Sequence, residues 1–151
     1  MWETRTALLS IDLSAPVAAR VEDISKALTS NGQITGGVTL FGHGGWADYG
    51  HGIESAVFLS PDHPLTASNM GILSNANLGP NASITLNACN TGNGSLGTSV
   101  AESLSHQLQR PTSGASSGMF FSNNPSARGI APVDASKPVY MVPWGKMVPF
   151  P

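Results

Sequence analysis

The sequence contains little charge, and this shortage excludes one large class of partners. Only 11% of its 151 residues are Asp, Glu, Lys or Arg, against about 25% in an average soluble domain. Seven basic residues are scattered among nine acidic ones, for a formal net charge of −2. A groove that follows nucleic-acid phosphates needs clustered Lys and Arg. The sequence therefore predicts no nucleic-acid partner.

Long apolar runs and a second thiol are also missing. No apolar stretch approaches the roughly 18–20 residues that span a bilayer, and residues 1–14 lack the basic and apolar blocks of a secretory signal peptide. The one cysteine, Cys89, excludes an internal disulfide. We therefore expect no membrane partner and a thiol that works in a reducing cytoplasm.

The chain does contain enough apolar material for one packed domain. Hydrophobic residues make up 40% of the sequence, and 151 residues match the size of a single domain. The 17 Gly and 11 Pro residues indicate abundant turns. We expect residues 1–151 to form one domain, and the sparse charge indicates that it is excised from a larger protein.

Hydrophobic periodicity predicts helices and strands in alternation. Helices are predicted at residues 16–28, 66–73 and 98–109, where apolar residues recur at helix spacing. Thr66 is the predicted N-cap of the second helix. Apolar runs predict strands at residues 7–13, 38–41, 83–88, 115–121 and 138–142. The prolines of the last strand favour a sheet edge. Residues 46–64, apart from a short strand at 56–59, and residues 122–137 are predicted to be loops, and the alternation favours an α/β sandwich.

Two glycine-rich motifs lack the context that their chemistry needs. Residues 92–97 match GxGxxG, but no acidic residue lies between Glu102 and Asp134, where a dinucleotide ribose would require one. Residues 114–118 match GxSxG, but no histidine follows His106. We interpret the first motif as a flexible turn and the second as a coincidence.

A metal site is a third possibility, with His43, His51, His63 and Cys89 as its candidate ligands. Their spacings of eight, twelve and twenty-six residues resemble no compact zinc pattern. We therefore expect no metal and no other cofactor.

A histidine and the cysteine follow two separate apolar strands. Residues 38–41 lead into His43-Gly44, and residues 83–88 lead into Cys89. If these strands are parallel neighbours, both side chains reach one carboxyl edge of the sheet, where α/β folds place their sites. Each residue alone has an ordinary structural explanation, because a lone cysteine is often a small buried apolar side chain. The joint placement favours a catalytic pair.

The chemistry of such a pair is nucleophilic catalysis. A thiolate is a better nucleophile than a thiol, and an imidazole can accept its proton and later protonate a leaving amine. The backbone N–H groups of Gly44 and Cys89 could hold the oxyanion of the intermediate.

The blocks VTLFGHGG and ITLNACNTG resemble the two motifs of the caspase-like cysteine peptidases, which include caspases, gingipains, clostripain, separase and bacterial CHAT domains. The NACNTG block, with the following helix and PTSG segment, resembles C-terminal domains of bacterial Rhs-type polymorphic toxins. The resemblance covers residues 36–118. It implies a caspase-like three-layer sandwich, in which a mostly parallel central sheet is flanked by helices. It also implies His43 as general acid/base, Cys89 as nucleophile and the Gly44 N–H as oxyanion donor, without a cofactor.

Some residues need a choice or remain open. His51-Gly52 is a second His-Gly pair, but it follows a turn rather than an apolar strand, which favours His43. No specificity pocket follows from the two motifs. In the loop after the histidine, acidic side chains could bind a basic residue and aromatic ones could line an apolar pocket: Asp48 and Glu54, and Trp46 and Tyr49.

The sequence thus predicts a cysteine endopeptidase that works through a thioester acyl-enzyme. We expect a secreted bacterial toxin effector or self-processing domain that is delivered into a target cell. Its partners would be a protein substrate and an immunity protein or the parent toxin shell. Two alternatives stay open: a catalytically silent caspase-like binding module, and a cysteine-dependent deamidase or acyl transferase.

Overall fold

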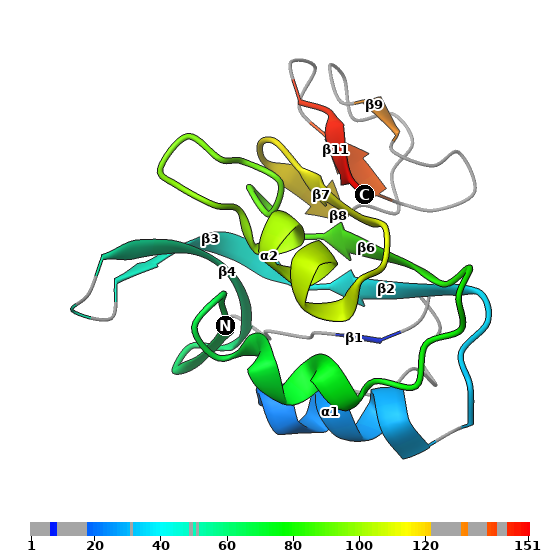
Figure 1. Ribbon diagram of the computed structural model, residues 1–151. Coiled ribbons are helices and arrows are strands. Elements are labelled where there is room, and N and C mark those ends of the chain that lie inside the picture. Colours follow the sequence, from blue (N-terminus) through cyan, green and yellow to red (C-terminus); the bar gives the residue numbers. More distant parts are fainter. Residues whose placement is uncertain are drawn as a thin grey trace.

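The computed structural model describes residues 7–8, 18–30, 32–48, 50, 52–121, 131–132, 139–141 and 145–151 (Figure 1). Its elements, in chain order, are β1 (Ala7–Leu8), α1 (Val21–Ser30), β2 (Gly37–Phe41), β3 (His43–Asp48), β4 (Ile53–Ser60), β5 (His63–Leu65), the 3-10 helix η1 (Met70–Asn75), β6 (Ser83–Asn87), α2 (Val100–Leu108), β7 (Thr112–Ala115), β8 (Met119–Phe121), β9 (Ala131–Pro132), β10 (Val139–Met141) and β11 (Met147–Phe150). No helix among these residues is long and apolar enough to cross a membrane.

A five-stranded sheet with the order β1-β2-β6-β7-β11 forms the centre of the fold. Its three inner strands run parallel, and the outer strands β1 and β11 run antiparallel to their neighbours. Two smaller antiparallel sheets, β3-β4-β5 and β8-β10-β9, accompany it. The protein is therefore a mixed α/β fold whose central strands are parallel, as the alternation of elements predicted.

The main core covers one face of this sheet. Val38 of β2 pairs with Ile84 of β6, so their side chains share a face, and both belong to the main hydrophobic cluster. The buried residues of α1, η1 and α2 belong to the same cluster, which places all three elements on that face: Val21, Ile24, Leu28, Met70, Leu73, Val100, Ala101 and Leu104. Among the described residues, these helices therefore cover one face of the central sheet.

The two longer helices begin later than their apolar periodicity predicts. A carboxylate oxygen of Asp23 accepts the N–H groups of Ala19 and Arg20 at 3.0 and 2.9 Å, and this local turn precedes α1. In α2, the Ser99 side chain accepts the N–H of Glu102 at 3.2 Å and caps the helix start. Residues 16–17 of the first predicted helix lie outside the described residues.

The short strand predicted at residues 56–59 lies within β4, but the prediction of a loop for the rest of residues 46–64 was wrong. Strands β3 and β4 pair along their length from His43–Phe58 to Asp48–Ile53, and β5 adds a third strand. This hairpin extends away from the main sheet (Figure 1). β3 is glycine-rich and has no apolar alternation, so its strand conformation depends on pairing with β4 rather than on local preference.

The helix predicted at residues 66–73 was also wrong. Only η1 is helical there, and Thr66 is not its N-cap. Instead, the Thr66 N–H donates to Asn69 Oδ1 at 2.9 Å, and Asn69 Nδ2 donates to the Pro64 carbonyl at 2.7 Å. These bonds hold residues 66–69 in a turn, which competes with helix formation.

The C-terminal third differs from prediction in several places. The single strand predicted at residues 115–121 is two strands, β7 and β8, which belong to different sheets. β10 is the middle strand of its sheet, not an edge, and β11 was not predicted at all. Residues 131–132 of the predicted loop form the strand β9. The rest of that loop, residues 122–130 and 133–137, lies outside the described residues, as do residues 9–13 of the first predicted strand and residues 138 and 142 of the last one.

Candidate active site

The structure places His43 and Cys89 at the same edge of the central sheet. The last residues of β2 and β6, Phe41 and Asn87, are register partners, and the Gly42 N–H donates to the Asn87 carbonyl at 3.3 Å. His43 and Cys89 each follow two residues later. The parallel pairing of the strands therefore brings the ends of the two sequence blocks together.

Gly44 is in direct backbone contact with Cys89. A Cβ atom added at Gly44 would overlap the Cys89 carbonyl oxygen and would lie 2.7 Å from its nitrogen and 2.8 Å from its carbonyl carbon. No side chain fits at this position, which explains the glycine after His43 by close packing. His43 precedes Gly44 in β3, so strand alternation places its exposed side chain on the opposite face of the hairpin, together with that of Phe58.

The Cys89 thiol is partly buried and is held by the backbone of β8. The Met119 N–H donates to Cys89 Sγ at 3.2 Å, and the thiol donates to the Met119 carbonyl at 3.5 Å. Cys89 also packs against a small apolar cluster made of Phe41, Ala115 and Met119. Sequence reasoning missed Met119, because its segment carries no periodic signal that relates it to Cys89.

Thr91 anchors the turn at residues 89–92, called the cysteine turn below because it carries Cys89. Its hydroxyl is fully buried, donates to the Ala88 carbonyl at 2.9 Å and accepts the Ala115 N–H at 3.1 Å. Asn90 has the left-handed φ of 59°, a conformation that Asn tolerates better than most residues. Its N–H donates to the Ser117 carbonyl at 3.0 Å. Thr91 thus ties this turn to the end of β7, and Asn90 ties it to the chain just beyond β7.

The two glycine-rich motifs meet beside this turn. A Cβ at Gly92 would lie 2.7 Å from the Gly114 carbonyl carbon, and one at Gly114 would lie 2.7 Å from the Gly92 nitrogen. The Gly92 N–H donates to the Ala115 carbonyl at 2.8 Å. Gly92 and Gly114, the first glycines of the GxGxxG and GxSxG motifs, therefore allow two backbone segments to pack closely. The GxSxG segment lies beside Cys89, since Ala115 belongs to the apolar cluster that Cys89 packs against.

The hairpin presents Trp46 toward the cysteine turn. Trp46 is directly opposite Ser55 in the β3–β4 pairing, so the two side chains share a face. Ser55 Oγ donates to the Asn90 carbonyl at 3.4 Å, which identifies this face as the one next to the cysteine turn. Half-buried Trp46 therefore lies on the hairpin face next to the cysteine turn.

The two acidic candidates lie on opposite faces of the hairpin. Asp48 shares the face of Trp46 but is exposed, and its carboxylate accepts the Gly50 N–H at 2.8 Å. Glu54 is opposite Ala47 on the other face, and it accepts a hydrogen bond from Ser68. They cannot act together on one basic side chain. Tyr49 and His51 lie outside the described residues.

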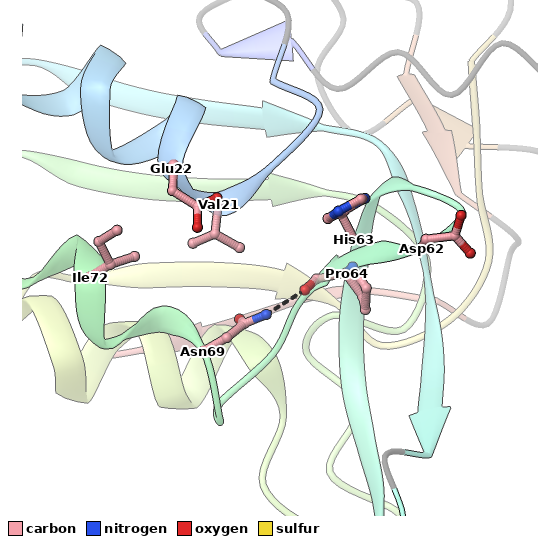
Figure 2. A pocket seen from close by; sticks show the side chains of 7 residues that line it. All are labelled: Val21, Glu22, Asp62, His63, Pro64, Asn69 and Ile72. Atoms are coloured by element: carbon pink, nitrogen blue, oxygen red, sulfur yellow. Dashed lines mark hydrogen bonds between the residues drawn. The ribbon is translucent and has the colours of Figure 1, made fainter.

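A separate pocket of about 270 Å³ lies between the start of α1, β5 and η1 (Figure 2). His63 lines it and shares a hydrogen bond of 2.9 Å between its Nδ1 and Ser60 Oγ. Neither His43 nor Cys89 contributes to this pocket. Within the described part of the chain, no group of three or more His, Cys, Asp or Glu residues is placed to hold a metal ion.

In comparisons with known proteins, no family model, no curated protein and no solved structure matches this chain.

Proposed function

We propose that this protein is a caspase-like cysteine endopeptidase in which Cys89 is the nucleophile and His43 is the general acid/base. The observation that carries the proposal is the contact of Gly44 with the Cys89 backbone at the carboxyl ends of β2 and β6. Parallel central strands and the resemblance of both sequence blocks to the peptidase motifs support it. A caspase-like three-layer sandwich is part of this proposal.

The reaction would begin with transfer of the Cys89 proton to the His43 ring, which would have to turn toward the sulfur from the opposite face of β3. The sulfur attacks the scissile carbonyl carbon, and a C–S bond forms while the carbonyl oxygen takes the negative charge. In this proposal the Gly44 and Cys89 N–H groups hold this oxyanion, and the contact of Gly44 with the Cys89 backbone supports that role. The C–N bond then breaks as His43 returns the proton to the leaving amine. Water hydrolyses the resulting thioester and restores the thiol.

The residues around Cys89 also suggest where a substrate side chain would bind. Trp46 lies on the hairpin face next to the cysteine turn, so it would line an apolar part of the substrate site. As in the sequence-based expectation, the protein would act as an effector or self-processing domain of a secreted bacterial toxin. Its thiol would remain reduced in the cytoplasm of the target cell.

The test is a map of new peptide termini in a cell lysate treated with the protein. We expect termini that share one residue type before the cut, and we expect Cys89→Ala and His43→Ala each to abolish them. His51→Ala, which changes the second His-Gly pair, is the matched control and should cleave normally. Each variant should keep the far-UV circular dichroism spectrum of the parent.

Continued cleavage by either Cys89→Ala or His43→Ala would refute the assignment of the pair. If new masses depend on Cys89 but no peptide bond is cut, the products identify a deamidase or acyl transferase instead. If no product depends on Cys89, the silent binding module replaces the peptidase.

A further inference from the structure

We infer that the backbone N–H of Met119 is a positioning group that holds the Cys89 sulfur for nucleophilic attack. The inference rests on the proposed role of Cys89 and extends it to a residue outside both sequence blocks. It starts from two hydrogen bonds between Met119 and Cys89. The Met119 N–H donates to Cys89 Sγ at 3.2 Å, and the thiol donates to the Met119 carbonyl at 3.5 Å.

The geometry of β8 explains why both Met119 groups reach the same atom. In an antiparallel strand, the N–H and C=O of one residue point to the same side. Met119 pairs with Met141 of β10, and β8 is an edge strand of its sheet. Because both Met119 groups point to Cys89, they point away from β10. The sulfur therefore occupies a position at the open edge of β8, where another strand would otherwise bond.

Neighbouring contacts hold this edge in place relative to the cysteine turn. Asn90 donates its N–H to the Ser117 carbonyl at 3.0 Å, and Asn93 Nδ2 donates to the Ser116 carbonyl at 3.1 Å. Ser116 is bound in turn to Lys146 by two hydrogen bonds, of 2.9 and 3.0 Å. The Met119 side chain is only 5% exposed. The Met119 N–H is thus a donor already fixed in place, which is the condition for effective electrostatic support.

The two contacts respond differently when the thiol loses its proton to His43. The S–H bond to the Met119 carbonyl disappears, and the oxygen then repels the charged sulfur. The N–H bond becomes stronger, because a charged acceptor binds a donor more tightly than a neutral one. The Met119 N–H would therefore favour the thiolate, while repulsion from the Met119 carbonyl oxygen would direct the sulfur away from that oxygen. Among the described residues, the ionisable side chains of the segments next to Cys89 are His43 and Asp48 on β3 and exposed Lys146 beside Ser116.

Alkylation of Cys89 by iodoacetamide tests this inference on the intact chain, with intact mass as the readout. Cys89 is the only cysteine, so each added mass reports on this one sulfur. Met119→Pro removes the N–H, and no ladder bond to β10 is lost because the group points to Cys89. We expect alkylation at neutral pH to slow by about tenfold, the effect of one hydrogen bond to a charged atom. The rate profile should also move to higher pH.

Met119→Leu is the matched control, since it changes the side chain and keeps the N–H. It should alkylate at the parental rate with the parental pH profile. If Met119→Pro does not fold, replacement of Met119 by its α-hydroxy acid analogue deletes the N–H without the proline ring. Unchanged or faster alkylation in a folded variant without the N–H overturns the inference, and so does an equal loss in Met119→Leu.

The alkylation assay needs no substrate, so its result is separate from that of the peptidase test. Absence of Cys89-dependent cleavage would refute the proposed function while a slowed alkylation would still show that Met119 holds the sulfur. In an active peptidase, we expect Met119→Pro to lower kcat by a similar factor with little change in KM.

Discussion

Substitution of Gly44 by alanine is the sharpest test of the contact at the centre of the candidate site. The new methyl group would overlap the Cys89 carbonyl oxygen and lie 2.7 Å from the Cys89 nitrogen. Because backbone atoms cannot turn aside as a flexible side chain does, β3 and the cysteine turn must separate. His43 and Cys89 would move apart with them.

The size of the effect follows from two general costs. Overpacking of this kind destabilises a protein by about 1–3 kcal/mol, which for a chain of this length lowers the melting temperature by about 2–12 °C. A displacement of about 1 Å between reacting groups costs about 100-fold in rate. We therefore expect Gly44→Ala to lower the cleavage rate about 100-fold, while the melting temperature falls by only about 2–12 °C.

Gly45→Ala is the matched control for this prediction. It makes the same change one residue further along β3, where the new Cβ would meet only the edge of the Phe58 ring at 3.3 Å. Initial rates on a cleaved peptide and thermal melts would be measured for both variants. If Gly44→Ala keeps activity within a few-fold of Gly45→Ala and melts at the same temperature, the contact does not position the catalytic pair.

Two further predictions concern stability. Thr91→Val keeps the shape of the side chain but leaves the Ala115 N–H and the Ala88 carbonyl without their hydroxyl partner, so we expect a loss of about 1–3 kcal/mol. Urea unfolding measures it, and Thr91→Ser should recover most of the loss; a stable Thr91→Val would contradict the anchoring role. Leu86→Ala removes a fully buried side chain from the central strand β6 and should cost about 2–5 kcal/mol. Thr85→Ala, on the opposite face of the same strand, should cost clearly less in the same assay, and equal losses would contradict the assignment of the core to one face.

Local patterns predicted the elements that carry the two blocks. The apolar runs that form β2 and β6 are short, buried on one face and bounded by turn residues, so they were recognised almost to the residue. Ile24 and Leu104 belong to apolar stripes at helix spacing, which identified α1 and α2. The residues that surround Cys89 from other parts of the chain gave no comparable signal.

The hairpin and the β8 contact show why such signals were absent. β3 has the composition of a turn, and it is a strand because β4 supplies its hydrogen-bond partners. Met119 meets Cys89 through a chain reversal after β7, and no periodicity encodes such a reversal. Asp48 and Glu54 are close in sequence, yet the pairing of their strands places them on opposite faces.

By itself, the sequence determined that His43 and Cys89 closely follow two buried strands, since such strands are encoded in short runs of apolar residues. The tertiary structure decided that those strands are parallel neighbours and that Gly44 touches Cys89. It also decided which peptide group faces the sulfur. Such contacts depend on how segments far apart in the sequence pack against each other. Because backbone atoms have the same chemistry in every residue, the sequence carries no signal for which of them meet.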